Sequence, residues 1–205
     1  HSSDILENVA ADMVGLYLTD SAISILNKEL VEIEDPLATD IEYLTDDYLK
    51  TGLIFEITGV PTERLAECDF KIKEIMAALA TDVGGFDLEY MKEIINQQKL
   101  KFVSDTEKSP RILFNFAIVD FLYGDEKTLE KWTKDLREYD ILLEWTASEW
   151  CSFVGKWFVE NKSASVLGKP SAKLYSEQKV RDKKIAKSIK EKYGKEGLEK
   201  LEREL

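Results

Sequence analysis

The stretch from Leu49 to Leu79 constrains the fold most, because the spacing of its apolar residues changes part-way along. Leu53, Phe55 and Ile57 alternate with residues of the opposite face, which is the period of a β-strand. Further along, the apolar residues recur every three or four positions, the period of a helix with one buried stripe: Leu65, Cys68, Ile72, Ile75, Met76 and Leu79. The sequence therefore predicts a strand that leads directly into a helix.

The junction between strand and helix is marked by Gly59 and Pro61. Proline fixes φ near the helical value and lacks a backbone donor that the first helical turn does not use. A strand with one apolar face must bury that face, and the helix that follows is its nearest cover. We therefore predict an α+β fold, with an antiparallel sheet covered by helices and a charged C-terminal helical linker.

Other segments extend this prediction. Ala38 to Leu44 has the pattern of a strand and Asp46-Asp47 that of a turn, so we expect an antiparallel hairpin with the strand from Leu49 to Val60. A brief final strand is predicted over Ser163 to Leu167. Helices are expected over residues 5–18, after Ser21, and over 65–80, 88–104, 111–123 and 141–159. The helix over 111–123 is apolar on all sides, which predicts nearly complete burial.

Charge separates the chain into two parts. The 205 residues carry a net charge of −12, which disfavours nucleic acid or an anionic membrane as the main partner. From Ser171 onward there are 11 basic and 7 acidic residues, so 17 basic and 33 acidic residues remain before it. We predict a domain over residues 1–170 and a charged helical linker segment over 171–205. The linker has helical patterns from Tyr175 to Tyr193 and from Leu198 to Leu205, with a hinge at Gly194.

Cys68 and Cys151 both lie within apolar helical patterns and lack metal-type spacing. We interpret them as buried free thiols, which fit a reducing compartment. The sequence has no run of 18 uncharged apolar residues, and no signal peptide opens it. We expect an intracellular protein, cytoplasmic rather than in the mitochondrial matrix, with no membrane partner.

Polar residues of the body do not form a recognisable catalytic set. His1 is the only histidine, which excludes a Ser-His-Asp or Cys-His arrangement and a histidine-based zinc site within the body. The acidic residues from Glu32 to Asp35 and the pair Asp46-Asp47 have the pattern of solvated surfaces. Asp120 is the single acid inside the apolar 111–123 helix, and we interpret it as a local hydrogen-bond acceptor.

Two further patterns have structural interpretations. Gly84-Gly85 lacks the spacing of phosphate-binding loops, so it predicts a plain turn. Trp150 and Trp157 are seven residues apart on one helical face and, with Trp145, predict core packing rather than a ligand box. From the residues alone we assign no catalytic, cofactor-binding or metal-ligating residue to this chain.

The order of parts resembles a domain of the pitrilysin or insulinase family of zinc metallopeptidases, and is most similar to the presequence-protease branch. Four stretches carry the resemblance: Tyr17 to Leu30, Phe55 to Pro61 with its following helix, Ser109-Pro110-Arg111, and Phe121 to Asp125. They occur in the family's order within residues 4–167. Family enzymes contain four related α+β domains around a closed chamber, in two halves joined by a charged helical linker. The segment after Ser171 is similar to that linker, which implies the second domain.

This sequence lacks the residues that carry catalysis in the family. The inverted H-x-x-E-H motif, whose histidines bind zinc and whose glutamate activates water, has no counterpart here. Family fourth domains have an arginine and a tyrosine in the region that corresponds to Leu26 to Thr39, and this sequence has neither there. The resemblance therefore carries over no catalytic residue. Family domains also begin with a strand that this chain lacks, so we expect an exposed sheet edge.

The resemblance implies a non-catalytic domain of a zinc-dependent peptidase, which forms part of the peptide-degradation chamber and supports the zinc-bearing domain. We expect the chain alone to be inactive and without cofactor, whereas the parent protein binds zinc and cleaves peptides. Its partners would be the other domains of the parent chain and, in the parent, peptide substrates. Two alternatives remain open: a domain of a catalytically inactive structural subunit of the same family, and a helical adaptor that binds a partner through its tail.

Overall fold

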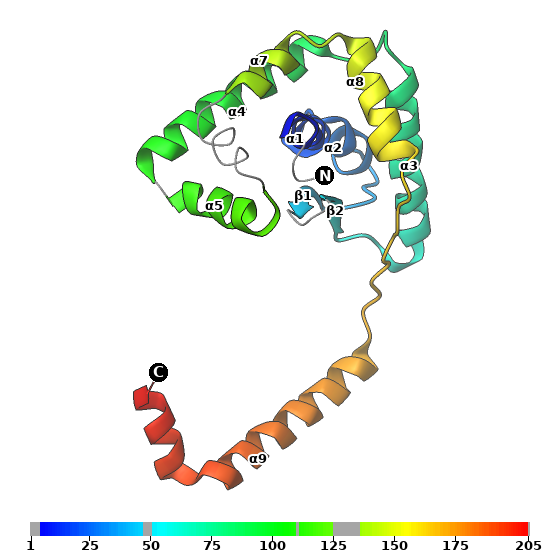
Figure 1. The fold of residues 1–205 in the computed structure, drawn as a ribbon. Coiled ribbons are helices and arrows are strands. Elements are labelled where there is room, and N and C mark those ends of the chain that lie inside the picture. Colours follow the sequence, from blue (N-terminus) through cyan, green and yellow to red (C-terminus); the bar gives the residue numbers. More distant parts are fainter. Residues whose placement is uncertain (1–4, 47–50, 110, 125–135, 205) are drawn as a thin grey trace. The chain divides into compact units, whose positions relative to one another are not determined.

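The computed structural model describes residues 5–46, 51–109, 111–124 and 136–204. The chain forms two compact units, a body (His1–Ser165) and a tail (Val166–Leu205), drawn in Figure 1. The elements of the body are, in chain order, α1 (Ile5–Thr19), α2 (Ile25–Leu30), β1 (Asp40–Asp46), β2 (Gly52–Thr58), the 3₁₀ helix η1 (Thr62–Arg64), α3 (Leu65–Thr81), α4 (Leu88–Lys108), α5 (Arg111–Tyr123), α7 (Arg137–Leu143), α8 (Ala147–Val154) and the π-helical turn η2 (Gly155–Val159). Helices combined with an antiparallel sheet confirm the predicted α+β class.

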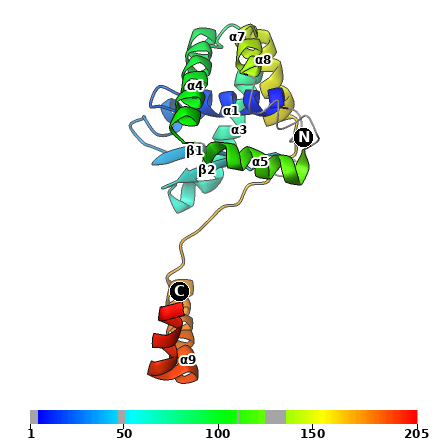
Figure 2. The same cartoon turned by 60° about the vertical axis from the view of Figure 1, so that its left-hand side comes forward.

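α1 is the central helix of the body. Its buried side chains include Val14, Tyr17 and Leu18, and α2, α4, α7 and β1 all pack against it (Figures 1 and 2). A Cβ atom on Gly15 would overlap the ring of Tyr43, so this glycine lets the hairpin approach the helix closely. The apolar stripe predicted for residues 5–18 is therefore the core of the body.

β1 and β2 form the predicted antiparallel hairpin. β1 begins and ends two residues later than the strand predicted over Ala38 to Leu44. Tyr43 lies opposite Phe55, with ring centroids 5.3 Å apart on the face that packs against α1. Leu44 lies opposite Ile54 on the other face, where both are exposed. Within the described part of the chain the sheet has two strands, and no third strand pairs with either outer edge.

The second layer of the core joins α3 to α8 and η2. Trp150 is fully buried, and its ring lies 4.7 Å from that of Trp145 between centroids. Phe153 lies between Trp150 and Trp157, in contact with both rings. Core packing of the tryptophans is thus confirmed.

The predicted helix over 141–159 is divided, because Thr146 begins a new helix inside it. The Thr146 hydroxyl accepts a hydrogen bond from Glu149 N at 3.3 Å, and Glu149 Oε2 accepts one from Thr146 N at 2.7 Å. This reciprocal capping box starts α8 after α7 has ended. The strand predicted over Ser163 to Leu167 is wrong, since these residues form no ladder with another strand.

Nearly complete burial of the 111–123 helix is also a wrong prediction. α5 has the predicted bounds, but Phe114, Ile118, Phe121 and Leu122 are 64, 56, 87 and 57% exposed. A helix that is apolar on every side needs neighbours on every side to be buried. The described residues provide α4 as its main neighbour.

The tail consists of an extended segment followed by α9 (Ala172–Glu204). Its backbone leaves the helical region at Gly194, where φ is 60° and ψ is −175°. A positive φ favours glycine, which has no Cβ to clash. The kink confirms the hinge predicted at this residue.

Candidate functional site

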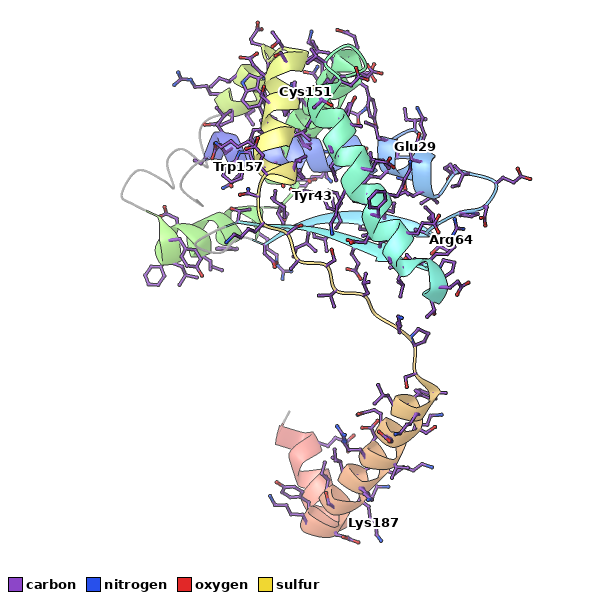
Figure 3. The ribbon with its side chains drawn as sticks, turned by 90° about the vertical axis from the view of Figure 1, so that its right-hand side faces the viewer. Glu29, Tyr43, Arg64, Cys151, Trp157 and Lys187 are labelled. Carbon is purple, nitrogen blue, oxygen red and sulfur yellow. The ribbon has the colours of Figure 1, made fainter. Side chains whose placement is uncertain are left out.

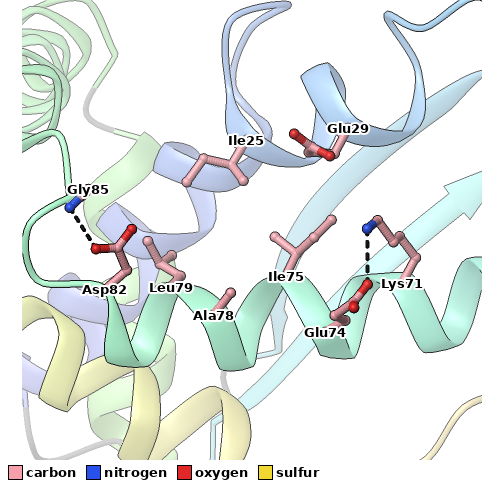
Figure 4. A pocket seen from close by; sticks show the side chains of 9 residues that line it. All are labelled: Ile25, Glu29, Lys71, Glu74, Ile75, Ala78, Leu79, Asp82 and Gly85. Carbon is pink, nitrogen blue, oxygen red and sulfur yellow. Dashed lines mark hydrogen bonds and ion pairs between the residues drawn. The ribbon is translucent and has the colours of Figure 1, made fainter.

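An open pocket of about 370 Å³ lies between α2 and α3 (Figure 4). Its apolar floor is formed by Ile25, Ile75 and Leu79, with Ala78 beside them. Its rim is polar and mostly acidic, formed by Glu29, Lys71, Glu74 and Asp82. Gly85 closes the end that lies beyond the last turn of α3.

The α2 side of the pocket is held by hydrogen bonds at the turn between α1 and α2. The Asn27 side-chain amide donates to the carbonyl oxygens of Thr19 and Ser21, both at 2.9 Å. The buried Ser24 hydroxyl lies 3.1 Å from the Tyr90 hydroxyl on α4. A helix of six residues is not stable by itself. These hydrogen bonds stabilise α2 by joining it to the end of α1 and to α4.

The α3 side of the pocket follows from the helical period. Ile75 and Leu79 are four residues apart, so they lie on one face and point toward the core. Lys71 and Glu74 flank that face, and the Lys71 ammonium donates to Glu74 at 3.0 Å. This hydrogen bond, with the charge of Glu74, raises the pKa of Lys71, and the charge of Glu29 on α2 raises it further.

The turn after α3 completes the pocket. Asp82 Oδ1 accepts a hydrogen bond from the backbone N–H of Gly85 at 2.9 Å, and a Cβ atom on Gly85 would overlap the Asp82 carboxylate. The plain turn predicted for Gly84-Gly85 is therefore confirmed.

The arrangement suits one kind of ligand. The floor can take an apolar side chain, and the rim carries three carboxylates against one ammonium, which is already paired with Glu74. Basic groups on either side of the apolar side chain would meet complementary charge. The residues that line the pocket include no nucleophile with an adjacent base.

The sequence did not indicate this pocket. Lys71 and Glu74 were visible only as a polar pair on the solvent side of a helix, and Glu29 as one charge on another helix. These three residues line one pocket only because α2 and α3 pack side by side in the tertiary structure.

Those acids considered from the sequence that the structure describes do not line the pocket. Asp35 is exposed and pairs with Arg64 at 2.8 Å, and Arg64 also binds Glu67 at 2.9 Å. Asp120 on α5 is half-buried, and its Oδ1 has no hydrogen-bond partner among the described residues. The acceptor role predicted for Asp120 therefore has no observed donor at that oxygen. His1 and Asp47 lie outside the described residues.

Both cysteines are buried free thiols, as predicted (Figure 3 labels Cys151). Burial raises the pKa of each thiol, with Asp69 and Glu67 adding to the effect at Cys68 and Asp82 at Cys151. A raised pKa keeps a thiol protonated and unreactive near neutral pH. Neither cysteine has the character of a nucleophile.

Tyr43 is half-buried, and its hydroxyl oxygen is buried without a visible role. Its ring lies between the hairpin and the helices that cover it (Figure 3), and its hydroxyl has no hydrogen-bond partner in the described part of the chain. Burial, with a smaller contribution from the charge of Asp12, raises its pKa. We assign Tyr43 no chemical function.

No group of three or more His, Cys, Asp or Glu side chains among the described residues has an arrangement that could hold a metal ion. Nor does any described helix combine the length and apolar character needed to cross a bilayer.

The chain is similar in sequence to parts of three longer proteins. An uncharacterized protein of Saccharomyces cerevisiae is 34% identical over 178 residues, which cover 85% of this chain and 17% of the yeast protein. Uncharacterized proteins of Caenorhabditis elegans and Schizosaccharomyces pombe are 28 and 26% identical over 99 and 92% of this chain, and 21 and 18% of their own lengths. The chain therefore spans about a fifth of the curated relatives that it matches. No family model matches it, and no solved structure does.

Proposed function

We propose that this chain is a non-catalytic domain of a larger zinc-dependent peptidase of the pitrilysin type. In that protein it forms part of the chamber that encloses peptide substrates, and it supports the zinc-bearing domain. The proposal combines the ordered resemblance of four stretches, from Tyr17 to Asp125, with the acidic pocket between α2 and α3.

The pocket is the observation that carries the proposal. An apolar floor with a carboxylate rim suits short peptide segments that contain an apolar residue beside basic ones. The surrounding body is acidic too, with 33 acidic and 17 basic residues before Ser171. Such a surface attracts basic peptides over distances comparable to the Debye length, about 8 Å at physiological salt.

Zinc belongs to the rest of the protein in this proposal. The described residues contain no donor set that fits the ion, and the relatives extend far beyond the matched region. The chain supplies binding surface and mechanical support, whereas the metal and its activated water would be held by another domain.

The first test compares the full-length protein with this chain alone. We expect the full-length protein to cleave a fluorogenic peptide, to lose this activity with a zinc chelator and to regain it when zinc is added. We expect the 205-residue chain to do none of this. Tight zinc binding or peptide cleavage by the chain alone would contradict the proposal.

The second test addresses the pocket within the full-length protein. The double change Glu29→Gln and Glu74→Gln should raise KM about two- to five-fold for peptides with lysine beside an apolar residue, since exposed charge interactions are worth up to about 1 kcal/mol. The kcat should not change. The matched control is Glu89→Gln, an exposed glutamate on α4 that pairs with Lys92. Equal KM values for the double variant and the control would count against the pocket.

Two other functions remain as alternatives. If the full-length protein folds but lacks both activity and an H-x-x-E-H motif, the chain is a domain of an inactive structural subunit.

A helical adaptor is favoured by one observation: Ile185, Ile189 and Tyr193 on α9 are exposed and spaced four residues apart, so they form one apolar stripe. Partner capture that requires residues 179–205 while the body is dispensable would support the adaptor.

A further inference from the structure

α5 carries an apolar stripe that the described residues of the body leave exposed. Phe114, Ile118 and Phe121 are spaced by four and three residues, and Leu122 adjoins them, so their side chains lie on one face of the helix. All four are more than half exposed. Ala117, between them in the sequence, is exposed as well. We call these five residues the α5 stripe.

The stripe is unusual for an exposed surface. Single apolar side chains on a surface are common, but a contiguous patch with two phenylalanines marks an interaction site. α5 packs against α4 and lies on the side of the body away from α3 and α8 (Figures 1 and 2). Among the described residues, the stripe is therefore an exposed face at the edge of the body.

The dimensions of the stripe argue against a second copy as its occupant. A helix of 13 residues is about 20 Å long and about 10 Å wide, so its footprint is on the order of 200 Å². Stable complexes between separate proteins bury about 800 Å² on each partner. The net charge of −12 on each chain would also oppose self-association.

A small apolar patch is sufficient when its partner belongs to the same polypeptide. Covalent connection raises the effective concentration of the partner to the millimolar range, so a weak contact is occupied. About four-fifths of each curated relative lies outside the matched region, which provides such a partner.

We propose that the α5 stripe is an interdomain docking surface, covered by an apolar face of another part of the same longer polypeptide. The inference rests on the proposed function only in so far as both require a longer chain. It makes no use of zinc or peptide cleavage.

The test is hydrogen exchange of the α5 backbone amides in the full-length protein and in the 205-residue chain. We expect exchange at least ten-fold slower in the full-length protein, because a covered helix opens less often. Phe121→Lys should abolish the difference, while leaving the 205-residue chain folded, since this side chain is 87% exposed there. Phe70→Lys is the matched control, because Phe70 is a 68% exposed phenylalanine on α3 outside the stripe.

The outcomes separate the two proposals. Equal exchange in both proteins would overturn the docking surface, even if the full-length protein proves to be a zinc peptidase. Slow exchange in the 205-residue chain that depends on its concentration would overturn it in favour of a second copy. Protection of α5 that is sensitive to Phe121→Lys would support the docking surface, even if no peptide is cleaved.

Discussion

α1 and α5 are apolar helices of similar length, 15 and 13 residues, and they lie in opposite environments. α1 is surrounded by α2, α4, α7 and β1, and its side chains form the core. α5 has a comparable apolar content but exposes four large side chains. The comparison teaches that apolar composition specifies a need for burial, whereas burial itself depends on what other elements are present to cover the helix.

The largest expected effect compares one leucine from each helix. Leu18→Ala in α1 should lower the free energy of unfolding by about 2–5 kcal/mol, because it leaves a cavity in a packed core. Leu122→Ala in α5 should change it by less than about 0.5 kcal/mol, because the side chain already faces solvent. Urea denaturation of the 205-residue chain measures both. Equal losses would show that α5 is covered in solution and would break the comparison.

A smaller effect is expected where α1 meets the hairpin. Gly15→Ala should cost about 1–3 kcal/mol, because the added methyl group overlaps the Tyr43 ring and forces the hairpin to shift. The control is Gly155→Ala, whose Cβ would lie 3.7 Å from the Cβ of Ala80, an ordinary contact. It should be neutral or stabilising by up to about 1 kcal/mol, as alanine favours helices. Thermal melts that rank the two variants the other way would contradict the close approach.

The third prediction concerns a polar group in the α1 core. The Tyr17 hydroxyl accepts a hydrogen bond from Asp87 N at 2.9 Å, and its ring stacks on Phe86. Tyr17→Phe should cost about 1 kcal/mol, since the N–H loses its acceptor. Urea denaturation at neutral pH measures this loss, and an unchanged midpoint would show that the bond contributes nothing.

The same tyrosine predicts a dependence on alkaline pH. Burial, partly offset by the Asp87 hydrogen bond, raises the pKa of Tyr17 to about 12 from its usual 10. The unfolded chain therefore loses this proton first, so the contribution to stability is complete below pH 10 and is lost as the pH rises to about 12. The decline in stability over this range should be shallower in Tyr17→Phe. Parallel declines in the two proteins would contradict the raised pKa.

The smallest effect is expected from the surface of α1. Glu7 pairs with Lys156 of η2 at 2.7 Å, and exposed ion pairs contribute about 0–1 kcal/mol. Glu7→Gln should therefore lower stability slightly at low salt and not at all at 1 M salt, where charges are screened. Thermal melts of the variant and the unchanged chain at low and at 1 M salt measure this difference in stability. A large, salt-independent loss would show that polar contacts, rather than apolar burial, hold α1 in place.

Local patterns in the sequence predicted much of the secondary structure. The bounds of α1 and α5 are within one residue of those expected, and the kink at Gly194 lies at the expected hinge. Each depends on residues within one or two turns of each other. The errors occurred where a local pattern was ambiguous. One is at Thr146, whose capping box divides one expected helix, and the other is over Ser163 to Leu167, which pair with no strand that the structure describes.

The candidate site was not predictable in the same way. The pocket joins Glu29 of α2 to Lys71 and Glu74 of α3, and these residues are about 40 positions apart in the sequence. Periodicity places each side chain on a face of its own helix, but it does not say which two helices meet. α5 shows the converse: its apolar character was visible from the sequence, and its exposure was not.

The sequence by itself determined the period, the ends and the apolar faces of the elements, because these depend on backbone geometry and on neighbours a few residues away. Tertiary structure alone decided that α1 is buried and α5 is not, and that three carboxylates surround an apolar floor between α2 and α3. The physical reason is that burial and electrostatic environment are properties of elements packed together, set by contacts between residues far apart along the chain.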